Sequence, residues 1–211
     1  NNGTVRTTDA SNNAGGIAGR IEDSTVTDCS NSGVIKADAG SAGHGVGGIV
    51  GQVYVDQKES NKITECTNTG NITAIGSDSA GYAGGIVGKL LGNTSGNSGT
   101  IEDCHNSGKI SMLDSTLCGI GGLVGVSFAN LTIEESSNTG SISSEESGSS
   151  NLAGGLVGQS SSEQSSSELT LTKSYNAGSV SSPSSDYVGG LVGQLMRPTT
   201  VNVNNCYNVG A

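Results

Sequence analysis

Residues 84–88 read Gly-Gly-Ile-Val-Gly, and close copies of this string recur along the chain. Glycine weakens both strands and helices, because it loses the most backbone entropy on folding and packs no side chain. A chain that repeats such an unfavourable element must satisfy a geometric requirement. The motif, GG[IL][VA]G, starts at Gly15, Gly47, Gly84, Gly121, Gly154 and Gly189, at intervals of 32, 37, 37, 33 and 35 residues.

A second motif, [CS]-x-N-x-G, follows each glycine motif. Its first position holds Cys29, Cys66, Cys104, Ser136, Ser174 and Cys206, and its asparagine is Asn31, Asn68, Asn106, Asn138, Asn176 and Asn208. An apolar residue lies three positions before each Cys or Ser, and in the first five copies another lies two positions after the glycine. The segment Asn1-Asn2-Gly3-Thr4-Val5 fits the end of one more copy. We therefore expect one repeat domain over 1–211, with a partial repeat at 1–14, as a segment of a longer protein.

Each repeat thus contains three short apolar segments in which β-branched residues dominate, and they are too short for helices. The pattern predicts an all-β parallel β-helix, or solenoid, right-handed by the crossover rule. It would have about six coils of 32–37 residues, with three short strands in each coil. A six-bladed propeller is the alternative, since the two ends of the chain resemble complementary parts of one repeat. Propeller blades, however, usually need four antiparallel strands and about 40–50 residues.

The repeated residues have structural explanations in a narrow solenoid. Glycine lets one segment of backbone cross close to another, and it can also adopt positive φ at a corner. Asparagine tolerates left-handed turns, and stacked carboxamides can hydrogen-bond from coil to coil as a ladder. At the Cys/Ser position we expect small buried residues rather than disulfides, because parallel stacked side chains suit a disulfide poorly.

The strings GGLVG and I-x-x-C-Y-N-x-G-x-V resemble the GLUG motif. The best copies are 189–193 with Cys206-Tyr207-Asn208, and 154–158 with Ser174-Tyr175-Asn176-Ala177-Gly178-Ser179-Val180. GLUG repeats accompany large secreted bacterial proteins, including adhesin-like proteins and immunoglobulin A-cleaving metallopeptidases. The resemblance implies an extracellular or bacterial cell-surface location. It covers almost the whole chain, although Ser replaces Cys at 136 and 174.

Composition excludes several classes of function. The formal net charge is −10, so nucleic acid and anionic membrane surfaces are not expected partners. No apolar stretch is long enough to insert into a membrane. The chain has two histidines, His44 and His105, and contains neither H-E-x-x-H nor G-x-S-x-G. We also expect no glycan-cleaving site, because Arg6, Arg20 and Arg197 do not recur at repeat positions. The sequence predicts that this segment is not an enzyme and holds no catalytic residues.

One column of charges raises the question of a cation. The residue before the Cys/Ser position is Asp28, Glu65, Asp103 and Glu135 in four consecutive copies, and Lys173 and Asn205 follow. Stacked carboxylates repel one another unless solvated or bridged, and Ca²⁺ takes such oxygen ligands. A solvated acidic stripe is the simpler interpretation, so Ca²⁺ is a weak candidate and no other cofactor is expected.

The predicted function is a non-catalytic structural or adhesive module of a bacterial surface protein. It would act as a rigid spacer and present loops at 36–46, 52–61, 89–99 and 159–168 to a host extracellular protein or glycan. Tyr54, Tyr82 and Tyr187 lie near loops and could stack on a sugar, although packing or surface decoration would explain them equally. The alternative is an auxiliary domain of a larger secreted enzyme, a metallopeptidase or a glycan-active protein, with catalysis in flanking domains.

Overall fold

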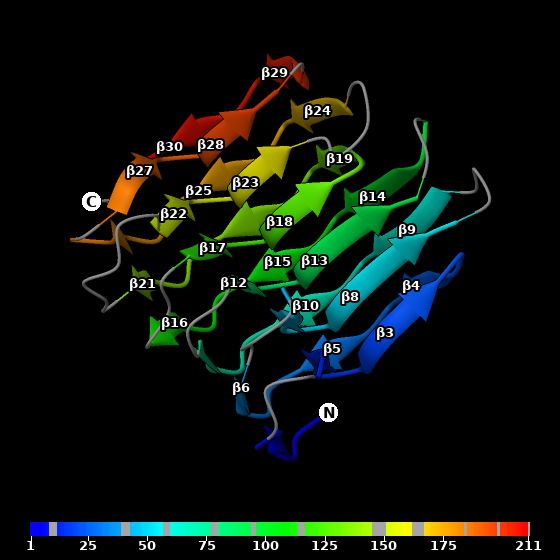
Figure 1. Cartoon of the computed structure of the whole chain (residues 1–211), viewed down its shortest axis with the longest axis vertical. Helices are drawn as coiled ribbons and strands as arrows, with labels where there is room; N and C mark the ends of the chain where they lie inside the picture. The colour runs from blue at the N-terminus through cyan, green and yellow to red at the C-terminus, as the bar shows by residue number, and fades with distance from the viewer. Residues whose placement is uncertain are drawn as a thin grey trace.

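The computed structural model describes residues 1–8, 12–38, 43–56, 60–76, 80–93, 96–113, 117–144, 151–161, 167–183, 185–197 and 199–210. In these residues the chain forms 30 strands and no helix, so no helix is present that could cross a membrane. The strands make five sheets of six, and every pairing within them is parallel. Figure 1 shows the coils stacked from the N-terminal end to the C-terminal end. The predicted parallel β-helix is confirmed, and the propeller is excluded because its blades would be antiparallel. Handedness stays a prediction.

We name the sheets A to E in the order in which each coil contributes to them. Sheet A contains β1 (Val5–Arg6), β6 (Ile35–Asp38), β11 (Ile72–Ile75), β16 (Ile110–Leu113), β21 (Ile142–Ser144) and β26 (Val180–Ser181). Sheet B contains β2 (Ala14–Gly15), β7 (Gly45–Gly47), β12 (Ala80–Gly84), β17 (Leu117–Gly121), β22 (Asn151–Gly154) and β27 (Ser185–Gly189). Sheet C contains β3 (Ala18–Glu22), β8 (Val50–Val55), β13 (Val87–Gly92), β18 (Val124–Phe128), β23 (Val157–Ser161) and β28 (Val192–Met196).

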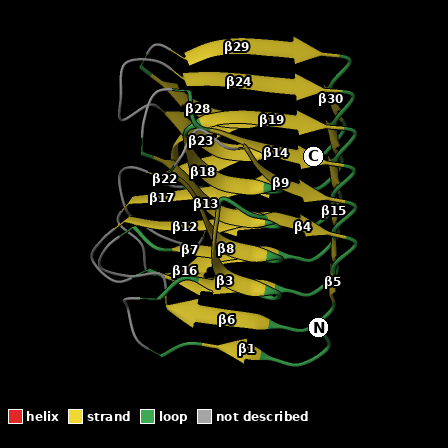
Figure 2. Cartoon of the chain, turned by 90° about the vertical axis from the view of Figure 1, so that its right-hand side faces the viewer, coloured by secondary structure: helices red, strands yellow, loops and turns green. Residues whose placement is uncertain are grey.

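The other two sheets complete each coil. Sheet D contains β4 (Thr25–Thr27), β9 (Ser60–Thr64), β14 (Ser98–Glu102), β19 (Asn130–Glu134), β24 (Ser167–Thr172) and β29 (Thr199–Asn204). Sheet E contains β5 (Ser30–Asn31), β10 (Thr67–Asn68), β15 (His105–Asn106), β20 (Ser137–Asn138), β25 (Tyr175–Asn176) and β30 (Tyr207–Asn208). Figure 2 shows successive strands of a sheet lying one above another.

The prediction of three strands in each coil was wrong, because there are five. The glycine pair separates sheet B from sheet C, so the apolar string that contains it belongs to two sheets. The strands of sheet E are only two residues long and hold the motif asparagine, so they lack the apolar alternation that marks a strand in sequence.

The repeat motifs stack in register. Each glycine that starts a GG[IL][VA]G motif is aligned with its counterpart in the next coil, from Gly15 with Gly47 to Gly154 with Gly189. The predicted loops were too wide, because strands occupy both ends of each of them: β6 and β7, β8 and β9, β13 and β14, β23 and β24. The central residues of these loops, 39–42, 57–59, 94–95 and 162–166, lie outside the described part of the chain.

The cross-section of the solenoid has two apolar cores. The large core lies between sheets C and D and includes Ile49, Val50, Ile63, Val87 and Ile101 with their stacked equivalents. The small core lies between sheets A and B and consists of Ala14, Ile35, Ala37, Val46, Ile72, Ala74, Ala83, Ile110, Met112, Ile120, Ile142 and Ala153. Between the two cores the cross-section of the solenoid narrows, and we call this region the waist. Here the second glycine of each pair packs against one of the six motif asparagines. These glycines are Gly16, Gly48, Gly85, Gly122, Gly155 and Gly190.

Close approach of backbone, rather than unusual φ, explains the glycines of the motif. A Cβ on Gly85 would overlap the carbonyl oxygen of Gly122 in the next coil and the carboxamide of Asn106. A Cβ on Gly88 would overlap the Val46 amide of sheet B. The predicted positive φ was wrong for these residues, since the described glycines with positive φ are Gly43 and Gly96. The string Gly-Gly-Ile-Val-Gly is therefore rich in glycine because backbone segments from opposite sides of the solenoid are in direct contact there.

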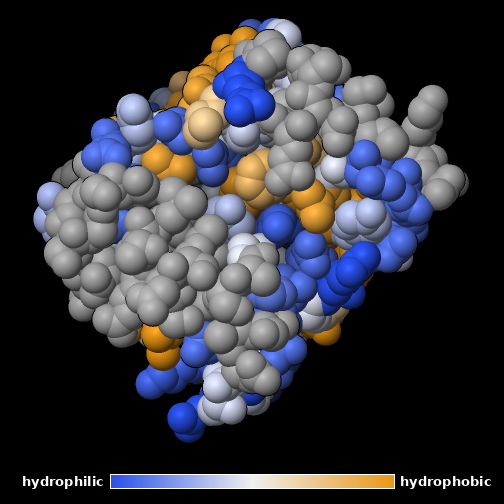
Figure 3. All heavy atoms as spheres, viewed as in Figure 1, coloured by the Kyte–Doolittle hydropathy of each residue, from blue (hydrophilic) through white to orange (hydrophobic). Residues whose placement is uncertain are grey.

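The two ends of the stack differ from its middle. The last coil exposes apolar side chains that are buried in equivalent positions elsewhere, and Figure 3 shows apolar surface at this end of the molecule. Those exposed by a third or more in the last coil, with buried partners in the preceding coil, are Tyr187, Val188, Leu195, Met196, Val201 and Val203.

Candidate functional site

A continuous ladder of carboxamides runs along the waist. The Nδ2 of Asn31 donates to Oδ1 of Asn68 at 2.8 Å, and Asn68 donates in the same way to Asn106 at 2.8 Å. The ladder continues from Asn106 to Asn138, Asn176 and Asn208 at 2.7 to 2.8 Å. The second N–H of each Nδ2 reaches the carbonyl of the glycine two residues later, as in Asn106 to Gly108 at 3.0 Å. The asparagines thus serve the fold through their side chains. The predicted left-handed backbone was wrong for them, since none is among the residues with positive φ.

The Cys/Ser position performs one hydrogen-bonding task in all six coils. The Ser136 hydroxyl donates to the Glu134 carbonyl at 2.7 Å, and the Cys104 thiol donates to the Glu102 carbonyl at 3.3 Å. The same side-chain oxygen accepts from the backbone of the preceding coil, since Cys104 N donates to Ser136 Oγ at 3.0 Å. The prediction for this position was only a small buried residue. The position requires a small side chain that can also form hydrogen bonds, which explains why either Cys or Ser occupies it.

Three thiols stack in consecutive coils. Cys29, Cys66 and Cys104 are free, as is Cys206, and Cys66 and Cys104 are fully buried while Cys29 and Cys206 are half-buried. Interaction with the neighbouring Cys66 thiol, followed by burial, raises the pKa of Cys104. At Cys66 the interaction with the neighbouring Cys104 thiol outweighs burial and lowers the pKa to about 7. The side chain of Cys118 lies outside the described part of the structure.

The acidic column has a conformational cause. Asp28, Glu65, Asp103 and Glu135 have φ between 48° and 54°, and Lys173 and Asn205 at the same position have φ of 49° and 54°. This left-handed turn connects sheet D to sheet E in every coil, and it disfavours bulky or β-branched residues. The column therefore reflects a backbone turn that polar residues tolerate on the surface.

Two lysines pair with carboxylates at or beside this column. Lys173 Nζ lies 2.6 Å from Oε1 of the column residue Glu135, and Lys62 Nζ lies 2.8 Å from Oε2 of Glu102, which directly precedes Asp103. Hydrogen bonding to these carboxylates raises the pKa of each lysine. A shallow groove of about 190 Å³ runs between the pairs, lined by Lys62, Thr64, Glu65, Glu102, Asp103 and Glu135. Among the described residues, no three His, Cys, Asp or Glu side chains are close enough to hold a metal ion. The Ca²⁺ site stays a prediction.

The structure brings together a serine, a histidine and an aspartate that the sequence analysis did not connect. His105 Nδ1 lies 2.9 Å from Ser137 Oγ, and His105 Nε2 lies 3.3 Å from Asp103 Oδ1. The arrangement has the order of a catalytic triad. Ser137 is only 4% exposed, however, and its amide donates to the Cys104 carbonyl as part of the bonding between coils. Only the register of two neighbouring coils could have revealed this cluster.

The three tyrosines proposed for sugar stacking have different environments. Tyr82 is 7% exposed and packs edge-on against Phe128, with ring centroids 6.0 Å apart. Tyr54 is half-buried beneath Arg20, whose guanidinium carbon lies 4.6 Å from the ring centroid. Tyr187 is 50% exposed in the last coil. Of the three, Tyr187 alone presents an open ring face.

A fourth aromatic feature was not predicted. Tyr175 and Tyr207 stack with centroids 5.0 Å apart and an angle of 1° between their planes. They occupy the outward position of sheet E in the last two coils, and Tyr207 is 53% exposed. The signal was present in the sequence as a tyrosine directly before two motif asparagines.

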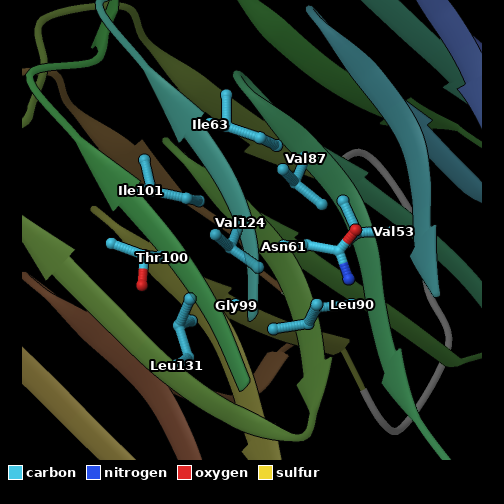
Figure 4. A pocket seen from close by; sticks show the side chains of 10 residues that line it. All are labelled: Val53, Asn61, Ile63, Val87, Leu90, Gly99, Thr100, Ile101, Val124 and Leu131. Carbon is cyan, nitrogen blue, oxygen red and sulfur yellow. The ribbon is translucent and has the colours of Figure 1, made fainter. Parts of the chain in front are cut away.

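A small void lies among described residues of the large core, as Figure 4 shows. Its volume is about 10 Å³, which is at the lower limit for one water molecule. It arises beside Gly99, whose partners in the neighbouring coils are Asn61 and Leu131. The void is a packing defect and cannot take a ligand.

Comparison with known proteins identifies the repeat. The GLUG motif matches residues 10–36 and 79–111. Each match covers one coil, from sheet B to the start of sheet A: β2 to β6 in the first and β12 to β16 in the second. The resemblance seen in the sequence is therefore confirmed at these two regions. Neither the search of curated proteins nor the search of solved structures found a match.

Proposed function

We propose that this GLUG-repeat solenoid is a non-catalytic spacer and adhesive module of an extracellular bacterial surface protein. The observation that carries the proposal is the continuous hydrogen bonding of six coils in five parallel sheets, together with the buried asparagine ladder. A stack of this kind resists bending because each coil is bonded to its neighbours around the whole perimeter. Six coils at about 4.8 Å each would span about 25–30 Å.

Sequence variation between coils supports the recognition half of the proposal. Residues that make coil-to-coil bonds repeat, whereas the segments joining sheet C to sheet D differ in length and composition. A single residue, Ala129, separates β18 from β19, whereas five residues separate β13 from β14 and five separate β23 from β24, and the last of these segments is rich in serine. A scaffold that keeps its bonds constant while its connections vary can change ligand without changing fold. A host extracellular protein or a glycan is the proposed ligand class.

Binding of the purified chain to an array of mucin glycans and extracellular host proteins tests the adhesive role. The test variant replaces residues 162–166 with a Gly/Ser segment of equal length. A matched control replaces residues 94–95 in the same way, on the same side of the coil. Saturable binding that one replacement abolishes, with unchanged melting temperature, would establish a recognition surface. Absence of binding by the folded chain would refute adhesion and leave the spacer role.

Insertion of repeats tests the spacer role separately. A duplicate of residues 84–120 adds one repeat and retains the register of the glycine motif, since Gly84 and Gly121 are aligned. Each added copy should lengthen the particle by about 4.8 Å, which small-angle scattering of a series with one to four insertions can resolve. An increase in radius without an increase in length would contradict a stiff spacer.

An auxiliary domain of a larger secreted enzyme is the second candidate function. The GLUG match supports it to the same degree, because the motif describes the repeat and not its neighbours. The residues flanking this segment in the gene would distinguish the two. A metallopeptidase domain with H-E-x-x-H would favour the enzyme, and a wall anchor with further repeats would favour the spacer.

A further inference from the structure

The thiol column contains more sulfur than the hydrogen bonds of the fold require. At the Cys/Ser position, Ser136 and Ser174 make the same bond to the carbonyl two residues earlier as the cysteines do. Sulfur is therefore not needed for folding at this position. Yet three consecutive coils hold Cys29, Cys66 and Cys104, whose thiols are neighbours along the edge of the large core.

We propose that the stacked thiols of Cys29 and Cys66 bind a soft, two-coordinate metal ion such as Cu(I). Coils of a parallel solenoid are spaced by about 4.8 Å, and equivalent side chains point the same way. That arrangement suits a disulfide poorly, because a disulfide needs Cβ atoms about 3.5–4.5 Å apart. Two metal–thiolate bonds of about 2.3 Å each, arranged linearly, span about 4.6 Å. The spacing that disfavours a disulfide therefore accommodates an ion between two sulfurs.

The surroundings favour a soft ion over a hard one. The thiols border a core of Ile, Val and Leu side chains, with Val26 and Ile63 beside them. Thiolates select Cu(I), whereas Ca²⁺ and Mg²⁺ require oxygen ligands. A site with two ligands does not need the group of three donors that other metals require.

The three thiols would have different tasks. Cys66 is the central thiol, because its coil lies between those of Cys29 and Cys104, as the bonds from Thr67 N to the Cys29 carbonyl and from His105 N to the Cys66 carbonyl show. Cys29 lies half-buried in the first coil and gives the ion a path from solvent. Cys104 is fully buried, and its thiol donates to the Glu102 carbonyl at 3.3 Å. On binding, the S–H bonds of Cys29 and Cys66 are replaced by two metal–sulfur bonds, and any protons still bound leave to solvent.

Substitution of single cysteines by serine tests the site without threatening the fold, since serine is native at two positions of the same column. The probe is Cu(I) under anaerobic conditions with a competing chelator, with Ag(I) as a second probe. The readouts are native mass spectrometry and thiolate-to-metal absorption. We expect one ion for each chain, with affinity at least tenfold lower in Cys29→Ser and Cys66→Ser.

Cys206 supplies the matched control, because it occupies the same position with Ser174 as its neighbour. Cys206→Ser should bind like the unmodified chain, and Cys104→Ser should keep the stoichiometry of one. Equal binding by Cys66→Ser and the unmodified chain would overturn the proposal. So would an equal loss in Cys206→Ser, which would indicate independent reaction of single thiols.

Discussion

The waist and the large core obey different rules, although both are buried and both run the length of the stack. In the waist every coil has glycine facing asparagine, without exception. In the large core one stacked position is Asn61, Gly99, Leu131, Leu169 and Val201 in successive coils. Backbone atoms meet backbone atoms in the waist and cannot yield, whereas flexible side chains fill the core and can compensate for one another. The same residues therefore recur in every coil at the waist, where opposite sides of the solenoid are in backbone contact.

The strongest test of this difference is a methyl group placed in the waist. Gly85→Ala would put Cβ inside the van der Waals radius of the Gly122 carbonyl oxygen and the Asn106 carboxamide. Neither group can move without breaking coil-to-coil hydrogen bonds, so we expect a loss of at least about 3 kcal/mol in unfolding free energy. Urea denaturation followed by circular dichroism measures it. A loss below about 1 kcal/mol would show that the waist can widen.

The asparagine ladder should be the next most sensitive feature. Asn106→Ala removes the acceptor of Asn68 and the donor to Asn138, and it leaves the buried Gly108 carbonyl without its side-chain partner. Buried unsatisfied groups cost about 1–3 kcal/mol each, so we expect a loss of about 2–4 kcal/mol. Asn93→Ala is the control, because its carboxamide bonds to Asp56 at the exposed surface. Equal effects of the two substitutions would refute a special role for the ladder.

The Cys/Ser position should distinguish hydrogen bonding from size. Ser136→Ala keeps a small side chain but removes the bond to the Glu134 carbonyl and the acceptor for Cys104 N, so we expect a loss of about 1–2 kcal/mol. Ser136→Cys retains both and should change stability by less than about 0.5 kcal/mol. Thermal unfolding of the two variants side by side gives the answer. The reverse order would mean that volume, not the hydrogen bond, selects the residue.

A glycine in the large core should behave in the opposite way to Gly85. The Cβ of Gly99→Ala would meet the two methyl groups of Leu90 at 2.9 Å, next to the void of about 10 Å³. Leucine methyl groups can shift, and alanine is less costly than glycine in a strand, so we expect a gain of about 0.5 kcal/mol. Differential scanning calorimetry would detect the higher melting temperature. Destabilisation by more than about 1 kcal/mol would show that this part of the core is as rigid as the waist.

The smallest effect concerns the acidic column on the surface. One of its carboxylates, Glu135, already has Lys173 as a partner, Lys62 pairs with the adjacent Glu102, and both ion pairs are exposed to solvent. We therefore expect Ca²⁺ or EDTA at millimolar concentration to move the melting temperature by less than about 1 °C, as is typical for weak screening at exposed pairs. A saturable rise that Asp103→Asn abolishes would establish a calcium site instead.

The positions of the repeated motifs could be predicted from the sequence alone. The positions of Gly84 and Asn106 within their motifs predicted a stacked β-helix, and the register of the glycine motifs follows the same alignment. The residues between the motifs were harder to interpret. Two-residue strands such as β15 are too short to show an alternation of apolar and polar residues. The proximity of His105 to Ser137 depends on the register between two neighbouring coils.

Periodic composition was sufficient to predict the fold class, the repeat positions and the glycines of the motif. The reason that those residues are required became visible only in the contacts between coils. Glycine is present to admit neighbouring backbone, asparagine to bond along the axis, and Cys or Ser to donate to a carbonyl. The reason is physical: steric overlap and hydrogen bonds between coils join atoms that are 30 or more residues apart, and no local pattern records which atoms meet.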